Sequence, residues 1–253
     1  MTRREADPLK IATVGYETLA SEYYDHIRHP TCADFRYASL HLIAGYLSLS
    51  NLGPSPRVLE VGAGRSVFVD LSAKFPHLLG KLVVTDQSRG MIGHTMLGSN
   101  DIDLVCANAE RLPFRDGEFD LMIASLGDPY NTEAFWREVG RVLTIGGRCI
   151  FTTPAASWSE RFRSEEQSGA KDIAVFETKE GATVGVPSFV LSPVDQMAFV
   201  ENLGLTTTDV WTFTRDMFPQ GAPLSPKIVG FTLDATPVVT QFVTRKEPHK
   251  PTG

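Results

Sequence analysis

The chain has 253 residues, of which 42% are apolar and 21% charged, and its formal net charge is −6. This is the composition of an ordinary globular protein, and it argues against a disordered chain, a collagen-like repeat and a disulfide scaffold. Basic and acidic side chains are divided equally between the two halves of the chain. Without a basic lobe to bind phosphates, we expect no nucleic-acid partner.

The three cysteines, Cys32, Cys106 and Cys149, are odd in number and widely spaced. Cys106 and Cys149 each lie in an apolar run, which predicts buried thiols in a reducing compartment. No apolar segment follows the basic residues at the N-terminus, and the longest uncharged stretch, residues 37–56, has helical apolar spacing. We therefore expect a cytoplasmic protein with neither a signal peptide nor a membrane span.

The first 53 residues predict a helical N-terminal cap. One helix is expected over 11–24 and a second over 34–49, with a break at His29-Pro30 between them.

From residue 57 onward, short apolar runs alternate with helical segments. Strands are predicted over 57–61, 81–85, 103–107, 119–124 and 148–152, the last after a Gly146-Gly147 turn. Helices are predicted over 66–75, 88–97 and 131–142. Strands that alternate with helices predict a parallel sheet with helices on both faces.

Beyond Pro154 the pattern loosens. The remaining predicted elements are a charged helix over 157–167, a hairpin of strands 174–176 and 183–190, a helix over 193–203 capped by Ser192, and strands over 206–213 and 238–244. We predict one domain over 54–244 with a lid insertion at about 157–190, and a disordered tail over 245–253.

The strongest motif is Val58-Leu59-Glu60-Val61-Gly62-Ala63-Gly64-Arg65-Ser66. A buried strand ends in a tight glycine turn and a helix begins at once, so the backbone can approach a ligand and direct free N–H groups at it. Val67 replaces the third glycine of the dinucleotide fingerprint, which disfavours NAD and FAD, and no P-loop lysine follows. Asp86, at the end of the next strand, can accept hydrogen bonds from two ribose hydroxyls, or can cap a turn.

A third run contains Leu112-Pro113-Phe114-x-Asp116-Gly117-x-Phe119-Asp120. Together with the glycine turn, Asp86 and Arg141-Val142-Leu143-x-x-Gly146-Gly147, it resembles the class I S-adenosylmethionine-dependent methyltransferases, in particular the branch typified by ubiquinone-biosynthesis enzymes. The likeness extends over residues 57–154. It implies a doubly wound, seven-stranded, mostly parallel Rossmann-like sheet, the cofactor S-adenosylmethionine, and in-line methyl transfer to a small-molecule acceptor.

The resemblance also implies a cofactor site. Glu60, Gly62 and Gly64 would surround the methionine moiety, and Asp86 would hold the ribose hydroxyls. The full set of implied cofactor positions is Glu60, Gly62, Ala63, Gly64, Asp86, Gln87, Asn108, Ala109 and Ser125. This chain departs from the family's pattern twice, with Ser66 in place of the third glycine and Asn108 in place of an aspartate beside the adenine. A serine suits a helix N-cap, and an amide can still bind the adenine edge.

The acceptor side needs alignment more than a dedicated catalytic residue, because the sulfonium already activates the methyl group. His29 is the candidate base, with a surface or capping histidine as the alternative. Tyr24, Asp128 and Tyr130 are candidates for the pocket wall. The run Asp128-Pro129-Tyr130-Asn131 partly resembles the Asp-Pro-Pro-Tyr signature of amino-methyltransferases that act on nucleic-acid bases. That activity, and a non-catalytic cofactor-binding regulator, stay open as alternatives.

Two further patterns have competing interpretations. His26, His29 and Cys32 have a spacing that invites a metal, but Pro30 breaks the helix that would align them, and we expect no metal. Aromatic residues gather in the lid and the late strands, either as ordinary packing or as an apolar acceptor pocket: Trp158, Phe162, Phe176, Phe189, Trp211, Phe213 and Phe218. The oligomeric state is left open.

Overall fold

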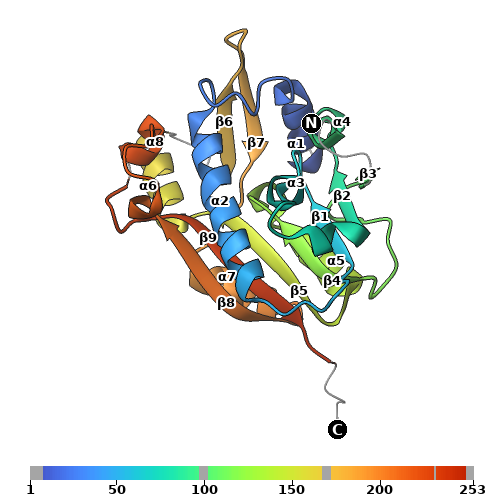
Figure 1. The fold of residues 1–253 in the computed structure, drawn as a ribbon. Coiled ribbons are helices and arrows are strands. Elements are labelled where there is room, and N and C mark those ends of the chain that lie inside the picture. The colour runs from blue at the N-terminus through green and yellow to red at the C-terminus, as the bar shows by residue number, and fades with distance from the viewer. Residues whose placement is uncertain (1–7, 97–101, 167–171, 231, 249–253) are drawn as a thin grey trace, which may run out of the picture.

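A computed structural model describes residues 8–96, 102–166, 172–230 and 232–248. Its centre is a seven-stranded sheet (Figure 1) with the order β3 (Asp103–Cys106), β2 (Leu82–Asp86), β1 (Val58–Val61), β4 (Phe119–Ala124), β5 (Leu143–Pro154), β9 (Pro237–Lys246) and β8 (Leu205–Thr214). Neighbours from β3 to β5 pair in parallel, whereas β9 is antiparallel to both β5 and β8. The doubly wound, mostly parallel Rossmann-like sheet is confirmed.

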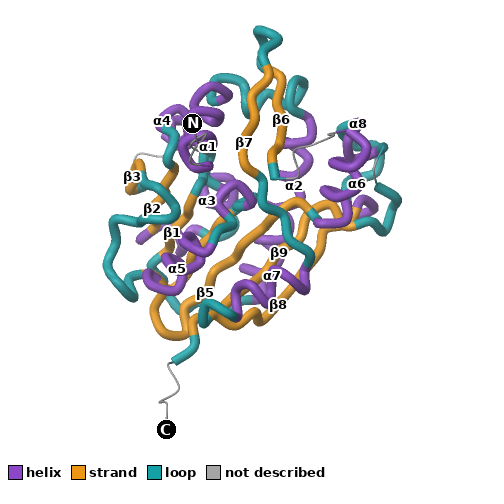
Figure 2. Tube along the Cα trace, turned by 180° about the vertical axis from the view of Figure 1, so that it is seen from behind, coloured by secondary structure: helices purple, strands orange, loops and turns teal. Residues whose placement is uncertain are grey.

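Helices cover both faces of this sheet, as the front and back views show (Figures 1 and 2). On one face lie α2 (Pro30–Leu49) and α3 (Val67–Leu71), and on the other lie α5 (Glu133–Val142) and α7 (Pro193–Glu201). A further helix, α4 (Arg89–Met96), packs on β2 and β3. Because both faces are covered, the central strands are apolar on both sides, which explains the continuous apolar runs in the sequence.

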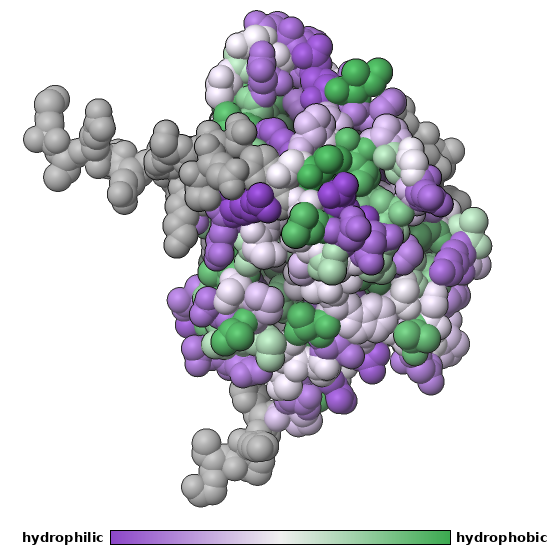
Figure 3. All heavy atoms as spheres, turned by 90° about the vertical axis from the view of Figure 1, so that its left-hand side faces the viewer, coloured by the Kyte–Doolittle hydropathy of each residue, from purple (hydrophilic) through white to green (hydrophobic). Residues whose placement is uncertain are grey.

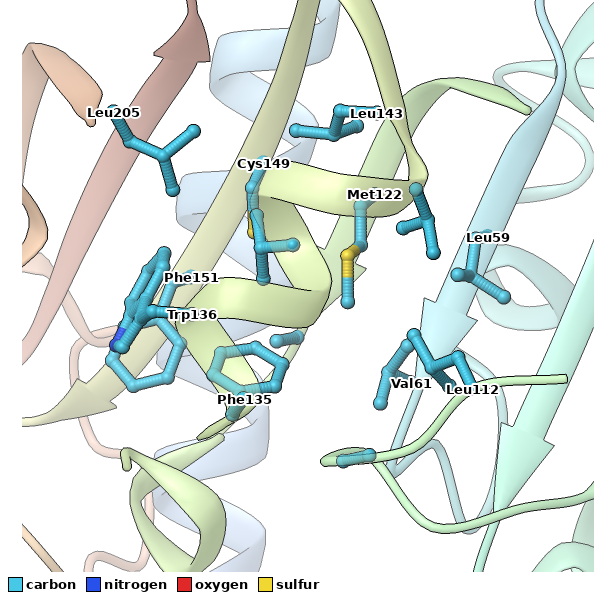
Figure 4. Packing of buried hydrophobic residues seen from close by; sticks show 14 of the residues in the cluster. Leu59, Val61, Leu112, Met122, Phe135, Trp136, Leu143, Cys149, Phe151 and Leu205 are labelled. Carbon is cyan, nitrogen blue, oxygen red and sulfur yellow. The ribbon is translucent and has the colours of Figure 1, made fainter. Parts of the chain in front are cut away.

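The core beneath α5 is built from its apolar stripe. Phe135, Val139 and Val142 recur at helical spacing and are fully buried. Trp136 packs against Phe151 of β5 with ring centroids 5.2 Å apart (Figure 4). This packing fixes α5 against β5.

The N-terminal cap and the predicted lid lie next to each other. A two-stranded hairpin of β6 (Ile173–Glu177) and β7 (Thr183–Pro187) packs against α1 (Pro8–Leu19). The contact is close because Gly15 has no side chain: a Cβ there would lie 2.6 Å from Cγ1 of Val186. The rest of the predicted lid is α6 (Ala156–Glu166), and α8 (Pro226–Val229) lies between β8 and β9 in the chain.

Several predicted helix boundaries are wrong. The first helix ends at Leu19 instead of residue 24, and the amides of Glu22 and Tyr23 both donate to the Leu19 carbonyl oxygen in the turns that follow. The second begins at Pro30 instead of residue 34, since proline is well suited to the first turn of a helix. The helix predicted over 66–75 spans only α3, although Ser66 is its N-cap as expected.

Three predictions about the sheet also need correction. The fifth strand begins at Leu143, so Gly146, with φ of +81°, forms an irregularity inside β5 instead of a turn before it. Cys106 is exposed instead of buried, because β3 is an edge strand. Residues 245–246 extend β9 instead of starting a disordered tail. The predicted positions 97, 167 and 249–253 lie outside the described residues.

Candidate active site

The candidate site lies at the carboxyl ends of β1 and β4. The strand order reverses there, because β2 and β3 continue on one side of β1 and β4 and β5 on the other. Open α/β sheets bind ligands at such a reversal. A cavity of about 100 Å³ lies at this point, and we call it the inner cavity. It is lined by Gly62, Ala63, Asp86, Gln87, Ala109 and Ser125, which are six of the nine predicted cofactor positions, and by Tyr24 and Tyr130.

The glycine turn has the backbone that the sequence predicts. Gly62 and Gly64 have φ of +60° and +51°, a region that side chains other than glycine rarely adopt. Behind the turn, the fully buried carboxyl group of Glu60 accepts hydrogen bonds from Ser66 Oγ at 2.5 Å and from the Val67 N–H at 2.7 Å. Burial raises the pKa of Glu60 to about 7. Glu60 therefore supports the start of α3 and is not among the residues that line the inner cavity.

Asp86 connects the turn to the next strand. Its Oδ2 accepts a hydrogen bond from the Gly64 N–H at 2.8 Å, and its Oδ1 accepts one from the Ser88 N–H at 2.8 Å. Burial raises its pKa to about 6, and these hydrogen bonds oppose the rise. The backbone N–H of Gln87 also acts on this carboxylate. A carboxylate has about four acceptor positions, so it can still accept a hydrogen bond from a ligand hydroxyl. This is the chemistry expected of a ribose-binding residue.

The resemblance implies that Gln87, Asn108 and Ala109 lie beside the adenine, but these three residues do not all reach the inner cavity. Gln87 and Ala109 line it. Asn108 is not among the lining residues, and its Oδ1 accepts a hydrogen bond from the Glu110 N–H at 2.8 Å in a local turn.

Two tyrosines pack directly on the glycine turn. Tyr130 Oη donates to the Val61 carbonyl oxygen at 2.8 Å, and its ring lies so close that a Cβ on Gly62 would be 2.5 Å from Cε1. Tyr24 Oη accepts a hydrogen bond from the Arg65 N–H at 2.7 Å and would overlap a Cβ on Gly64. Ligand pockets commonly enclose ~300–1,000 Å³, so an inner cavity of about 100 Å³ is small. A ligand as large as S-adenosylmethionine requires at least one of these rings to move.

A larger cavity of about 370 Å³ adjoins the first, and we call it the outer cavity. Tyr16, Tyr23, Cys32 and Leu126 line both cavities and so form the wall between them. Leu126 has φ of +53°, and its N–H donates to Thr152 Oγ1 at 2.8 Å, which holds the residue in this unusual conformation.

Of the aromatic residues singled out from the sequence, some line a cavity and others pack in the core. The rings of Trp158, Phe162 and Phe176 line the outer cavity, together with Phe35 from α2. Phe213 and Phe218 instead pack in the core between α2, α6 and β9. Phe189 and Trp211 are not among the lining residues of either cavity.

The residues predicted for the acceptor pocket are divided between the two cavities. Tyr24 and Tyr130 line the inner cavity, whereas His29 and Asp128 line the outer one. His29 is 8% exposed, and its Nε2 has no hydrogen-bond partner in the described part of the chain. Burial lowers the pKa of His29, which favours a neutral ring. Asp128 Oδ2 accepts a hydrogen bond from Ser188 Oγ at 2.5 Å.

The sequence interpretation missed Tyr16, Tyr23 and Arg36, which line the inner cavity. Arg36 Nη2 donates to Asp70 Oδ2 at 2.7 Å and to the Ser66 carbonyl oxygen at 3.3 Å, so it joins α2 to the glycine turn. Three tyrosines between residues 16 and 24 were a signal that could have been used. Across the described ranges, no cluster of three His, Cys, Asp or Glu side chains is arranged to hold a metal, and no helix is long and apolar enough to cross a membrane.

Comparison with known proteins agrees with this geometry. Residues 59–151 match the family model described as a methyltransferase domain. The ubiquinone/menaquinone biosynthesis C-methyltransferase UbiE of Shewanella sp. (strain W3-18-1) is 34% identical over 115 residues, which cover 41% of this chain and 45% of the relative. The chain thus matches less than half the length of that relative.

Solved structures extend the likeness of the fold beyond the matched segment. The DhpI-SAM-HEP complex has a TM-score of 0.64 at 16% identity and covers 97% of this chain and 100% of that chain. The Burkholderia thailandensis 1,6-didemethyltoxoflavin-N1-methyltransferase, with bound 1,6-didemethyltoxoflavin and S-adenosylhomocysteine, has a TM-score of 0.55 at 14% identity, covering 98% of this chain and 94% of that chain. At such low identity the likeness shows the fold.

Proposed function

We propose that this chain, whose residues 59–151 match a methyltransferase-domain family model, transfers a methyl group from S-adenosylmethionine to a small-molecule acceptor. The observation that carries the proposal is the joint position of the glycine turn and Asp86. Both lie at the reversal of the strand order, and Asp86 can still accept a hydrogen bond from a ligand hydroxyl beside the inner cavity.

The cofactor fits the groups that line the inner cavity. Once the Tyr130 ring has moved off Gly62, the backbone at Gly62 and Ala63 would allow close approach by a ligand. Asp86 would accept hydrogen bonds from ribose hydroxyls, and Gln87 and Ala109 would lie on the adenine side. Ser125, which directly follows β4, would lie on the methionine side. Three predicted cofactor residues do not line the inner cavity and instead hold its turns through hydrogen bonds: Glu60, Gly64 and Asn108.

The wall between the cavities is where we expect transfer to occur. S-adenosylmethionine supplies a methyl group that its sulfonium has already activated, so the protein mainly has to align the acceptor atom with the methyl carbon and sulfur. Tyr16, Tyr23, Cys32 and Leu126 touch both cavities and would position the two reactants for in-line displacement. A base at His29 would be needed only for an acceptor that must lose a proton.

A small acceptor is favoured by the outer cavity, whose size suits a small molecule. On the face turned to the viewer in Figure 3, hydrophobic residues form small separate groups among hydrophilic ones, without a broad apolar docking area. The net charge of −6 gives no support to a nucleic-acid acceptor. The free thiols of Cys32, Cys106 and Cys149 are in keeping with a reducing, cytoplasmic setting.

The experiment is calorimetry followed by a transfer assay. The purified chain should bind S-adenosylhomocysteine, and methyl-labelled S-adenosylmethionine should label a metabolite pool instead of tRNA, rRNA or DNA. Label found in nucleic acid alone would favour the amino-methyltransferase alternative and return Asp128 and Tyr130 to the active site. Binding without transfer to any pool would favour a regulator, and absence of binding would refute the proposal.

A further inference from the structure

Three hydroxyl groups form a hydrogen-bonded series that ends at the inner cavity, and we call it the hydroxyl relay. Ser39 Oγ, from α2, lies 2.7 Å from Ser125 Oγ and 2.7 Å from Thr152 Oγ1 of β5. Ser39 and Thr152 are fully buried, whereas Ser125 is partly exposed and lines the inner cavity. The hydroxyl relay therefore runs from the core beneath α2 to the candidate cofactor site.

Each hydroxyl group in the relay has one proton to donate, so its donors and acceptors can be counted. Thr152 Oγ1 already accepts a hydrogen bond from the Leu126 N–H at 2.8 Å. Within the described residues, the three hydroxyl groups make no other hydrogen bonds. The side-chain amide of Gln241, which lies opposite Thr152 on β9, has no partner there either, so it does not take the Thr152 proton. The acceptor that remains for this proton is Ser39 Oγ.

This count gives the hydroxyl relay one direction. If Thr152 donates to Ser39, then Ser39 donates to Ser125, and the Ser125 proton is left to point into the inner cavity. In the opposite direction the Thr152 proton would be buried without an acceptor, which costs free energy. If both neighbours donated to Ser39, the proton of Ser39 would be buried unpaired instead. The direction that satisfies every buried donor makes Ser125 a donor to a ligand.

The order of the strands indicates which part of the cofactor Ser125 meets. The strand that ends in Asp86, β2, lies on one side of β1, and β4, which leads to Ser125, lies on the other. A cofactor that binds Asp86 through its ribose and extends across the glycine turn of β1 brings its amino-acid end to Ser125. At that end of S-adenosylmethionine the ammonium is a donor and the carboxylate is an acceptor. A hydroxyl that donates into the cavity therefore suits the carboxylate.

We infer that Ser125 Oγ–H binds the carboxylate of the cofactor's amino-acid end, and that Ser39 and Thr152 are positioning residues that fix the direction of this donor. The inference rests on the proposed function, and it gives the buried face of α2 a part in cofactor binding. Hydrogen bonds in series polarise one another, so Ser125 is a stronger donor than an isolated serine. Thr152 also holds the Leu126 N–H, so the hydroxyl relay connects the cofactor site to the wall between the cavities.

Calorimetry with two ligands tests the inference on the full chain. Decarboxylated S-adenosylmethionine keeps the sulfonium and the ammonium of S-adenosylmethionine and lacks the carboxylate. Ser125→Ala should weaken the binding of S-adenosylmethionine about tenfold or more, because a hydrogen bond to a charged group is lost. The affinity for the decarboxylated ligand should stay unchanged, since that ligand has no acceptor for Ser125. If Ser125→Ala weakens both ligands equally, or neither of them, the inference is refuted.

Ser39→Ala tests the positioning role. Without Ser39, the Ser125 side chain can turn among about three staggered positions, so S-adenosylmethionine should bind about threefold more weakly and the decarboxylated ligand as before. In the Ser125→Ala background, Ser39→Ala should cause no further loss, because the two residues act through one hydrogen bond to the ligand. A merely structural role would instead weaken both ligands and add to the effect of Ser125→Ala. That result, or unchanged binding by Ser39→Ala, overturns the positioning role.

Ser48→Ala is the matched control from the same helix. Ser48 is exposed, donates to the Ala44 carbonyl oxygen at 2.7 Å and is not among the residues that line either cavity, so both affinities should stay unchanged. The same titrations separate this inference from the proposed function. If Ser125→Ala binds S-adenosylmethionine as well as the wild type does, the inference fails and the proposed function stands. If the wild type binds neither ligand, the proposed function fails and the inference falls with it.

Discussion

Replacing Tyr130 with phenylalanine tests whether the tyrosine ring closes the cofactor site in the free protein. The ring packs on Gly62, and its hydroxyl donates to the Val61 carbonyl oxygen at 2.8 Å. The substitution removes this one hydrogen bond and keeps the ring. A buried neutral hydrogen bond contributes ~0.5–1.5 kcal/mol, so we expect the free energy of unfolding to fall by about that amount.

The same substitution should strengthen the binding of the cofactor, although it lowers the free energy of unfolding. If the ring must leave Gly62 for the cofactor to bind, the wild-type protein loses the bond to Val61 on binding and the variant does not. The variant should therefore bind S-adenosylhomocysteine more tightly by up to ~0.5–1.5 kcal/mol, which is roughly 2- to 12-fold. A substitution that weakens the fold and strengthens binding would be hard to explain in any other way.

Urea unfolding and calorimetry with S-adenosylhomocysteine measure the two effects. Tyr46→Phe is the matched control, because Tyr46 is a buried tyrosine that packs on Trp211 and lines neither cavity. It should leave the affinity unchanged. Equal or weaker binding by Tyr130→Phe, with the expected loss of stability, would show that the ring stays in place when the cofactor binds.

Three other predictions concern the turn and its carboxyl groups. Asp86→Ala should weaken S-adenosylhomocysteine binding tenfold or more in calorimetry, and an unchanged dissociation constant would remove Asp86 from the site. Gly62→Ala should abolish cofactor binding with a near-normal circular dichroism spectrum. The stability cost is roughly 1–2 kcal/mol for the positive φ, to which the displacement of the Tyr130 ring adds, because the new Cβ would lie 2.5 Å from it; retained binding would contradict the assignment of the turn. Burial raises the pKa of Glu60 from 4.5 to about 7 and that of Asp86 from 3.8 to about 6, so the folded state binds protons that the unfolded state releases. The contribution of these two groups to stability should thus be greatest below their ordinary pKa values and be lost as the pH rises to about 7. In urea titrations at several pH values, the stability difference between the wild type and Glu60→Gln should therefore change over this range, and a difference that does not depend on pH would contradict it.

The fold and the glycine-turn side of the candidate site were predictable because their determinants are local in the sequence. A strand, a glycine turn and a helix follow one another at residues 58–71, and Asp86 ends the next strand. The carboxyl ends of parallel strands meet at one edge of a sheet, so these groups come together without any knowledge of distant contacts. The sequence patterns therefore placed Gly62 and Asp86 beside one cavity.

The lining of the outer cavity was not predictable in the same way. His29 and Lys227 are almost 200 residues apart, and α8, which carries Lys227, is a single turn without periodicity. Its place depends on a hydrogen bond that the Ser225 N–H donates to Asp34 and on one that Trp158 donates to the Lys227 carbonyl oxygen. Hydrophobic periodicity reports which face of an element is buried, but it does not report which distant element covers that face.

By itself, the sequence determined the type of sheet, the glycine turn with its positive φ angles and the carboxylate beside it, because each follows from residue chemistry within a few turns of chain. Only the tertiary structure decided that Tyr130 covers Gly62, that Glu60 supports the turn from behind, and that Cys106 is exposed on an edge strand. These outcomes depend on the order of the strands and on contacts between remote segments. Such contacts are selected by the packing of the whole chain, and no short stretch of residues encodes them.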